Sequence, residues 1–196
     1  MHKNNINLSK KILTWYDNNQ RTLPWRISKN SKKKQYYRLL SEFMLQQTQV
    51  KTVIPYFNNF VKKIPNLDAL SNCTNSKILK LWEGLGYYKR AKNLHKTSKI
   101  IIKKYKGKIP NDYTKLKELP GIGEYTANIL LALIYNQPRI GIDVNVKRVL
   151  LRIYNREIFN SEKLFNTRRN NDLAEALMEF GALICKLKDP NCQECK

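Results

Sequence analysis

The sequence predicts an all-α protein, and three observations lead to this prediction. Apolar side chains recur at helical spacing over long segments of the 196 residues. Glycine or proline marks the points where most of these segments stop. No segment shows convincing two-residue alternation, and there is no internal repeat or linker. We therefore expect nine or ten helices, more than an average globular protein has.

The N-terminal half is expected to contain three long helices. The first covers 6–18 and is broken by the Leu-Pro-Trp-Arg segment at 23–26. The lysine-rich segment 28–34 is expected to be an exposed loop. The second helix covers 36–47 and carries one apolar stripe. Thr48 is expected to cap a third helix that runs to residue 64.

The rest of the chain is expected to contain six more helices, several of them bounded by a glycine, a proline or an aspartate. Glycines at 84 and 86 end the first of them, and Gly107 and Pro110 end a basic one. Asp143 begins another, after Gly141 and Ile142. The expected helices cover 76–82, 89–105, 113–119, 124–135, 144–154 and 172–186.

The charge balance is far from neutral. Thirty-seven Lys and Arg residues stand against fifteen Asp and Glu residues, which gives a net charge of +22. Such a surface attracts polyanions, so the charge favours a nucleic-acid partner, although an A·T-rich genome also inflates lysine content. No apolar run approaches the ~20 residues of a membrane span, and no secretory signal begins the chain. We expect a cytoplasmic, nucleoid-associated protein.

A Pro-Gly-x-Gly turn at 120–123 separates two of the expected helices. Glycines allow a tight turn that exposes backbone N–H groups, and the next helix adds unpaired N–H groups of its own. Together they suit a phosphate. The alternative is an ordinary connection between two antiparallel helices.

Two carboxylates stand in opposite surroundings. Glu42 borders the apolar stripe of helix 36–47, with Gln46 and Gln49 on the same ridge, so its pKa should be raised. Asp143 stands at a helix N-terminus, which favours its ionised form. Such a pair breaks glycosidic bonds, because one group protonates the leaving group and the other supports the cationic centre. The alternatives are a solvated surface glutamate and a simple helix cap.

Aromatic and amide side chains near these positions suit contacts with bases. Trp25, Arg26, Tyr87 and Tyr88 place rings beside cations, an arrangement that stacks on bases and holds phosphates. The polar residues at 46–49 suit hydrogen bonding to base edges. Alternatively, the rings of Trp25 and Tyr88 belong to the hydrophobic core.

Three of the four cysteines lie close together near the C-terminus, at Cys185, Cys192 and Cys195. Thiolates with close spacing indicate an iron–sulfur cluster or zinc rather than disulfides. Either needs a fourth ligand, which we do not find in the sequence. Cys73 stands alone and is expected to be a small buried residue.

With these features the chain resembles the MutY-type adenine DNA glycosylases of the helix-hairpin-helix superfamily, over essentially its whole length. Six pieces in family order carry the resemblance, and together they are far more specific than any one alone. They are LPWR at 23–26, SEFMLQQTQV at 41–50, WEGLGYY at 82–88, LPGIGEYTA at 119–127, DVNVKR at 143–148 and EALMEFGA at 175–182.

The resemblance implies a role for most of the residues above. Glu42 would protonate the adenine, Asp143 would stabilise the cationic sugar, and Tyr125 would assist beside Asp143. Residues implied to contact the substrate are Trp25, Arg26, Gln46, Gln47, Tyr87, Tyr88 and Glu175, with Gln47 and Tyr87 as wedges in the base stack. Residues implied to bind phosphate are Gly121, Ile122, Gly123 and Lys147.

The resemblance also implies a domain organisation and partners. A six-helix barrel would cover 25–135 and include the hairpin at 113–135, while 1–24 and 136–196 would form a second helical subdomain. The active site would lie in the cleft between them. The second subdomain would hold a [4Fe–4S] cluster through Cys185, Cys192, Cys195 and a fourth cysteine that this sequence lacks. The substrate would be double-stranded DNA with adenine opposite 8-oxoguanine or guanine, bound by a monomer.

Some features separate this chain from its family or leave other functions open. Endonuclease III-like enzymes have lysine where Tyr125 stands, so we expect a monofunctional glycosylase without strong lyase activity. The family's C-terminal domain, which reads 8-oxoguanine, is missing, so the chain is expected to be a fragment or to work without it. The alternatives are a G:T or G:U mismatch glycosylase, a non-catalytic DNA-binding fragment and a zinc-binding structural protein.

Overall fold

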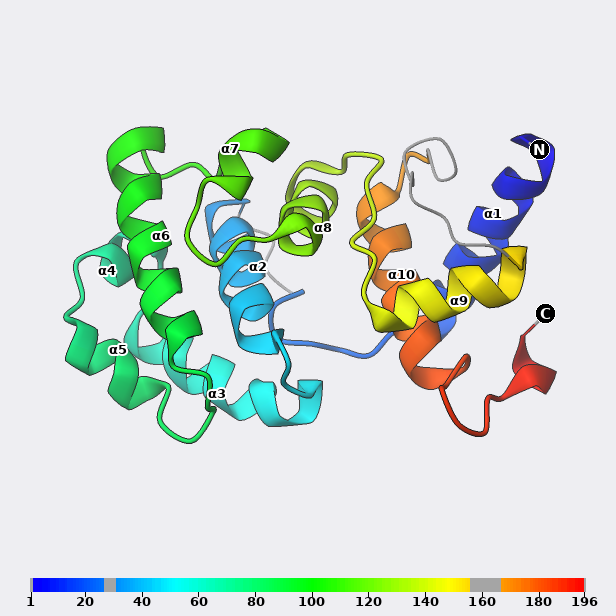
Figure 1. Ribbon diagram of the computed structural model, residues 1–196, viewed down its shortest axis with the longest axis horizontal. Helices are drawn as coiled ribbons and strands as arrows, with labels where there is room; N and C mark the ends of the chain where they lie inside the picture. The colour runs from blue at the N-terminus through cyan, green and yellow to red at the C-terminus, as the bar shows by residue number, and fades with distance from the viewer. Residues whose placement is uncertain (1, 27–30, 156–166, 196) are drawn as a thin grey trace. The chain divides into compact units, whose positions relative to one another are not determined.

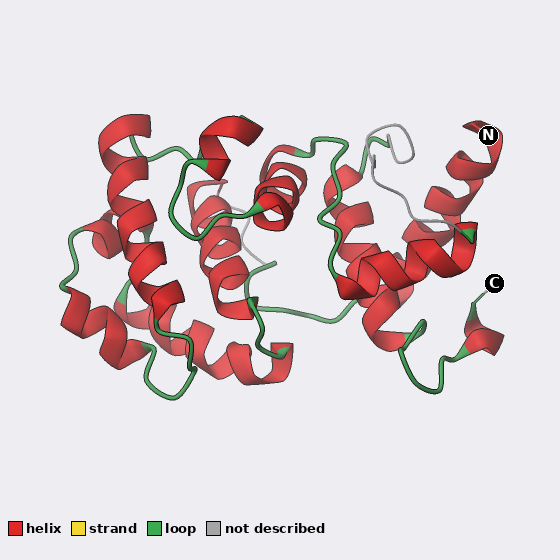
Figure 2. Cartoon of the chain, viewed as in Figure 1, coloured by secondary structure: helices red, strands yellow, loops and turns green. Residues whose placement is uncertain are grey.

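The structure is a computed structural model that describes residues 2–26, 31–155 and 167–195. Within these ranges the chain forms ten α-helices and one short 3₁₀ helix, with no β-strand (Figure 1, Figure 2). The all-α prediction is confirmed. Among the described helices, none is both long enough and apolar enough to cross a membrane.

The chain divides into two compact units, which we name the central unit (residues 22–123) and the N/C unit (residues 1–21 and 124–196). The central unit contains α2 (Ser31–Leu45), α3 (Val50–Lys63), α4 (Leu67–Ser71), α5 (Asn75–Leu81), α6 (Lys89–Tyr105) and α7 (Tyr113–Lys117). The N/C unit contains α1 (His2–Asn19), α8 (Glu124–Tyr135), α9 (Val144–Tyr154), α10 (Asn170–Leu183) and the 3₁₀ helix η1 (Cys192–Glu194).

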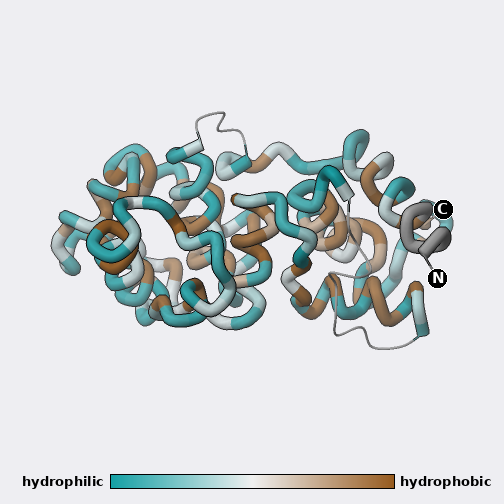
Figure 3. Tube along the Cα trace, turned by 90° about the horizontal axis from the view of Figure 1, so that it is seen from above, coloured by the Kyte–Doolittle hydropathy of each residue, from teal (hydrophilic) through white to brown (hydrophobic). Residues whose placement is uncertain are grey.

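The central unit is built on the apolar faces of α2 and α6. Both helices are amphipathic. Figure 3 shows hydrophobic residues interspersed with hydrophilic ones along the chain. Helix α6 packs against α2, α4 and α5, and α2 also packs against α3. The fully buried side chains include Tyr36, Leu39, Leu40, Phe43, Met44, Phe57, Phe60, Trp82, Leu94 and Ile101. Each such side chain contributes about 1.5–3 kcal/mol of hydrophobic stabilisation.

The N/C unit is organised around α10, which contacts α1, α8 and α9. Its main core cluster combines buried residues of α1, α9 and α10. Trp15 of α1 packs edge-on against Phe180 of α10, with ring centroids 5.1 Å apart. The cluster contains Ile12, Tyr16, Ile140, Val146, Val149, Leu150, Leu173, Ala176, Leu177, Phe180 and Ile184.

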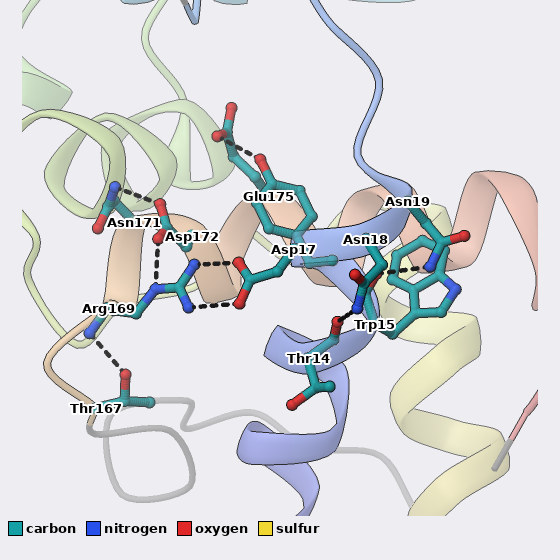
Figure 4. A network of polar contacts seen from close by, with 11 residues as sticks. Thr14, Trp15, Asp17, Asn18, Asn19, Thr167, Arg169, Asn171, Asp172 and Glu175 are labelled. Carbon is teal, nitrogen blue, oxygen red and sulfur yellow. Dashed lines mark hydrogen bonds and ion pairs between the residues drawn. The ribbon is translucent and has the colours of Figure 1, made fainter.

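A polar network joins the end of α1 to the start of α10 (Figure 4). Both guanidinium NH groups of Arg169 donate to Asp17, at 2.9 and 2.5 Å, and its Nε donates to Asp172 at 2.7 Å. The hydrogen bond from Arg169 lowers the pKa of Asp17. These groups are partly exposed, so the network orients the two helices more than it stabilises them.

The division into units differs from the expected one at both boundaries. The segment before the central unit ends at Arg21 rather than at residue 24, and the central unit ends at Gly123 rather than at residue 135. Helix α8 therefore belongs with α10. The physical reason is a core cluster of Ile129, Ala132, Leu133 and Ala174, which joins these two helices.

Several expected helix boundaries are wrong. Helix α1 covers His2–Asn19 and not 6–18, and α5 covers Asn75–Leu81 and not 76–82. Helix α7 ends at Lys117 and not at 119, and α10 covers Asn170–Leu183 and not 172–186.

Residues 31–34 of the predicted lysine-rich loop form the first turn of α2, because lysine is a good helix former and nothing breaks the chain there; residues 27–30 lie outside the described residues. Helix α2 ends at Leu45 and not at 47, because Gln47 adopts a left-handed conformation with φ 57°. The N-cap of α3 is Gln49 rather than Thr48.

Helix α4, which spans only five residues, was not predicted. A helix this short has no repeating apolar pattern to detect. Its start is fixed by Asn66, whose side chain accepts a hydrogen bond from the Ala69 N–H at 2.8 Å. The bounds of α6, α8 and α9 agree with the prediction at both ends.

Candidate active site

Glu42 lies on the buried side of α2, one turn before the end of that helix. Its neighbours Leu39 and Phe43 are fully buried, and Glu42 itself is only 6% exposed. The alternative of a solvated surface glutamate is therefore excluded. A carboxyl group with so little access to water is suited to carry a proton to a bound group.

The turn that follows α2 holds the polar segment 46–49. Because α2 ends at Leu45, Gln46 and Gln49 do not continue the helical ridge of Glu42 as expected. Instead, the Thr48 N–H closes the turn on the Leu45 carbonyl at 3.1 Å. The Gln46 side chain donates to the carbonyl of Gly121 at 3.2 Å. The polar turn and the glycine turn are thus joined directly, and Gln47 is left exposed.

The glycine turn between α7 and α8 has the predicted backbone shape. Gly121 has φ 82°, and a Cβ atom there would lie 2.8 Å from the Phe43 ring and 2.9 Å from the Asn93 Cβ. The Thr97 hydroxyl donates to the Pro120 carbonyl at 2.9 Å and holds the turn to α6. Gly123 is exposed and its Cβ position meets nothing within 4 Å. Phosphate binding at this turn remains a prediction.

The two glycines make a matched pair for a stability test. Gly121→Ala should lower the free energy of unfolding by about 2 kcal/mol, because alanine disfavours the positive φ and its methyl group overlaps Phe43. Gly123→Ala should change it by less than about 0.5 kcal/mol. Urea unfolding of both variants measures this. Equal effects would mean that the close packing of Gly121 is not what fixes the turn.

Sequence reasoning missed Arg90, which organises the exposed loops of the central unit. Its guanidinium donates to the carbonyls of Met44 (2.7 Å) and Gln46 and to the Thr48 hydroxyl (3.0 Å). It also donates to the carbonyls of Leu85 and Gly86, both at 3.2 Å. One buried cation therefore fixes two separate turns, and its burial lowers its pKa.

Arg90 also contacts two aromatic rings. Its guanidinium carbon lies 5.6 Å from the Trp82 ring centroid and 5.4 Å from that of Tyr87. Tyr87 has φ 48° and is 62% exposed, so the ring is displayed on a constrained backbone. One signal in the sequence could have identified Arg90: it is the only arginine of α6 and lies on the apolar face, four residues before Leu94.

Replacing Arg90 tests this arrangement. Arg90→Lys should lower the free energy of unfolding by about 2 kcal/mol, because an ammonium group cannot satisfy acceptors on both turns and leaves buried carbonyls unpaired. Lys92→Arg, an exposed change of the same kind on the same helix, should have an effect below about 0.5 kcal/mol. Denaturant unfolding distinguishes them, and a harmless Arg90→Lys would remove Arg90 from this role.

The remaining aromatic candidates differ in exposure. Trp25 is only 3% exposed and packs edge-on against Phe57, with centroids 5.3 Å apart. Tyr88 is 44% exposed, so it is not a core residue, and its hydroxyl lies 3.4 Å from the Gly84 N–H. Arg26 is half-buried next to Trp25 in the sequence. Base contacts by these side chains remain predictions.

Asp143, in the N/C unit, is the N-cap of α9. A helix cap was the alternative role that the sequence allowed for it. Its Oδ1 accepts the Val146 N–H at 2.7 Å and its Oδ2 accepts the Asn145 side chain at 3.3 Å. Asp143 thus satisfies one backbone N–H at the start of α9 and is held in place by a neighbouring side chain. Capping and catalysis are compatible, because the side chain is half-buried and held in one orientation.

Tyr125 and Glu175 belong to the same unit as Asp143. The Tyr125 ring covers Gly141, where a Cβ atom would lie only 2.8 Å from it, and its hydroxyl lies 3.3 Å from the Met178 sulfur. Glu175 is 4% exposed and accepts the Tyr16 hydroxyl at 3.0 Å. Gly141 lies two residues before Asp143, so the Tyr125 ring packs against the loop that leads into Asp143. Lys147 is exposed on α9.

The three C-terminal cysteines do not form a metal site as placed. Burial and the nearby thiols of Cys185 and Cys192 raise the pKa of Cys195. All three are free thiols, as is Cys73, which is half-buried. Among the described residues, no group of three or more Cys, His, Asp or Glu side chains is arranged to hold a metal ion. A [4Fe–4S] cluster takes four ligands, so the residues present do not fit it.

Curated proteins of similar sequence include adenine DNA glycosylases. The one from Buchnera aphidicola subsp. Baizongia pistaciae (strain Bp) is 44% identical over 195 residues, which are 94% of this chain and 54% of that protein. The one from Mus musculus is 35% identical over 201 residues, 94% of this chain and 39% of that protein. The chain thus spans about half the length, or less, of these relatives.

Solved structures agree on the fold. A thermostable thymine-DNA glycosylase matches with a TM-score of 0.81 and 25% identity, over 98% of this chain and 93% of that one. A non-covalent endonuclease III–DNA complex matches with a TM-score of 0.79 and 20% identity, over 100% and 92%. The second likeness shows an endonuclease III-like fold only.

A family model provides the assignment. The model of the HhH-GPD superfamily base excision DNA repair proteins matches residues 40–173, more than half of the chain. This range includes Glu42, the glycine turn and Asp143. The resemblance inferred from the six sequence pieces is confirmed at this level. The chain belongs to the HhH-GPD superfamily of base excision DNA repair proteins.

Proposed function

We propose that the chain is a monofunctional adenine DNA glycosylase, which hydrolyses the N-glycosidic bond of adenine mispaired with 8-oxoguanine or guanine. The observation that carries this proposal is the contrast between its two candidate carboxyl groups. Glu42 is 6% exposed among apolar side chains, whereas Asp143 has both oxygens hydrogen-bonded at a helix N-terminus. The similarity to proteins named adenine DNA glycosylase supports the choice of base.

In this proposal the two groups divide the chemistry between them. Glu42 gives its proton to the adenine, so that the base leaves as a neutral molecule, and then takes a proton from the attacking water. Asp143 stays ionised and stabilises the positive charge that develops on the sugar. Tyr125 assists next to Asp143, and it has no amine that could form a Schiff base with the sugar.

The other candidates bind the substrate. Glu175, Trp25 and Arg26 are assigned to adenine binding, and Gln46 and Tyr88 to contacts with the DNA. Gln47 and Tyr87, both exposed on backbones with positive φ, wedge into the base stack and offset part of the few kcal/mol that base flipping costs. The turn at Gly121–Gly123 and Lys147 hold phosphates.

The proposal extends to the setting of the protein. Its partner is double-stranded DNA, which a monomer binds in the nucleoid. No step depends on an iron–sulfur cluster, because the three cysteines present do not fit one. Cys185, Cys192 and Cys195 are therefore assigned no part in the chemistry.

A second candidate is a thymine or uracil glycosylase acting at G:T or G:U mismatches. It is favoured by the likeness to a thymine-DNA glycosylase with a TM-score of 0.81. Two buried glutamates, Glu42 and Glu175, favour adenine instead, because a carboxylic acid can protonate a ring nitrogen of adenine, whereas thymine leaves as an anion.

The deciding experiment measures base release by the 196-residue chain from four duplexes that differ in one pair: A:8-oxoG, A:G, G:T and G:U. We expect free adenine and abasic DNA from the first two, with no adduct trapped efficiently by borohydride. Thymine or uracil release would select the second candidate. Tight, salt-sensitive binding without any base release would select a non-catalytic DNA-binding module.

A further inference from the structure

The exposed face of α6 consists of lysine alone. Every exposed residue of this 17-residue helix is a lysine, and the helix contains no Asp or Glu. Six lysines, counting the C-cap, recur at spacings of three and four residues and so form one stripe along the helix. We call them the α6 lysine stripe: Lys89, Lys92, Lys96, Lys99, Lys103 and Lys106.

The stripe lies opposite the face that packs into the central unit. Ala91, Leu94 and Ile101 are fully buried on that other face. Lys104 lies beside the stripe and forms an ion pair with Glu118 at 3.2 Å. Within the described residues, none of the six stripe lysines forms an ion pair, so no acidic side chain in that part of the chain neutralises their charges.

Exposure alone does not explain this composition. Helix α3 of the same unit also has a long exposed face, which mixes Lys51, Thr52, Pro55, Asn58 and Lys62. The central unit as a whole holds 22 Lys and Arg against five Asp and Glu, so it carries +17 of the chain's +22. The α6 lysine stripe thus lies on the unit that holds most of the positive charge and that carries Glu42 and the glycine turn.

We propose that the α6 lysine stripe is a second DNA-binding surface, which contacts the phosphates of duplex DNA beyond the mispair. This inference rests on the proposed function only in taking DNA as the partner, since binding by the stripe needs no glycosylase chemistry. The stripe starts at Lys89, directly after Tyr88, and continues for about 25 Å along the helix. At 3.4 Å per base step, that length corresponds to about seven base pairs of flanking DNA.

The chemistry of the stripe favours DNA over an anionic membrane. A helix that binds a lipid surface presents apolar side chains beside its cations. The apolar side of α6 is buried in the core, so only ammonium groups are displayed. Flexible ammonium groups suit phosphates of any sequence and supply the salt-dependent part of DNA affinity.

The test compares two triple variants with the same change in net charge. The stripe variant combines Lys92→Gln, Lys96→Gln and Lys103→Gln, and the control combines Lys10→Gln, Lys62→Gln and Lys63→Gln, all at exposed positions. Glutamine keeps the helix propensity. Affinity for a fully paired duplex, with and without about seven extra base pairs on each side, is measured over a range of salt concentrations.

We expect the stripe variant to reduce the slope of log affinity against log salt by about 2 to 3 on the longer duplex, or about 100-fold in affinity at 0.1 M salt. On the short duplex it should differ little from wild type, and the control should change neither. Equal losses in both variants, or no loss in the stripe variant, would overturn the proposal. So would an unchanged DNA slope with lost binding to phosphatidylserine vesicles, which would indicate a lipid surface.

These duplexes contain no mispair, so the salt slope reports phosphate contacts whether or not the chain releases adenine. A chain that shows the expected slopes but no base release would contradict the proposed function and leave this surface in place. A chain that releases adenine but does not show the expected slopes would support the proposed function and contradict the proposed DNA-binding surface.

Discussion

Glu42→Gln should slow adenine release from an A:8-oxoG duplex by about 10³-fold, within the range that a positioned general acid contributes. The change removes one ionisable group and keeps the size of the side chain. Glu42 is 6% exposed on a helix whose neighbouring residues form the core, so the amide should stay in the same place. Single-turnover release of labelled adenine, with enzyme in excess, measures the chemical step apart from product release.

The matched control for this prediction is Glu83→Gln. Glu83 belongs to the same unit but is exposed, so the Glu83→Gln variant should release adenine at the wild-type rate. Unfolding in urea and binding to the uncleaved duplex show that the Glu42 variant is folded and competent to bind. If Glu42→Gln released adenine as fast as wild type, another group would have to supply the proton.

Asp143→Asn should slow the same reaction by about 10²- to 10³-fold, because a charge that stabilises the transition state is removed from a preorganised site. Asparagine is about as good an N-cap as aspartate, so its oxygen can still accept the Val146 N–H. The free energy of unfolding should change by less than about 0.5 kcal/mol. The slower release of adenine would then result from the missing charge and not from a weaker helix cap.

Asp112→Asn is the control for Asp143. Asp112 caps α7 in the same way, with its Oδ1 2.8 Å from the Lys115 N–H. The Asp112→Asn variant should have the stability and the rate of adenine release of the wild type. Asp143→Ala, by contrast, should lose the cap as well, at about 1 kcal/mol of stability. Should Asp143→Asn react at the wild-type rate, the residue would be a cap and nothing more.

The sequence was sufficient for the elements whose pattern is long and whose ends carry local signals. Helices α6, α8 and α9 lie where their periodicity and their glycine, proline or aspartate boundaries place them. The cap at Asp143 and the positive φ of Gly121 also follow from local chemistry. Such features depend on neighbours a few residues away, which a single sequence displays.

Features that depend on distant contacts were not predictable in the same way. The turn at Gln47 ends α2 early, and Arg90, 43 positions later, supplies the hydrogen bonds that hold it. Helix α8 joins the N/C unit through contacts with Ala174. Local propensity does not predict either contact. A basic residue on an apolar helix face, such as Arg90, could pair with several segments, and an apolar helix such as α8 could pack against several others.

The central claim is that Glu42 and Asp143 act on the same N-glycosidic bond, one protonated and one charged. The most direct test is the single-turnover rate of adenine release by wild type, by each single variant and by the double variant Glu42→Gln/Asp143→Asn. Groups that act as a unit give strongly non-additive losses, so we expect the double variant to be within about tenfold of the slower single variant. A double variant whose loss equals the product of the two single losses would show that the carboxylates act independently, and would contradict the claim.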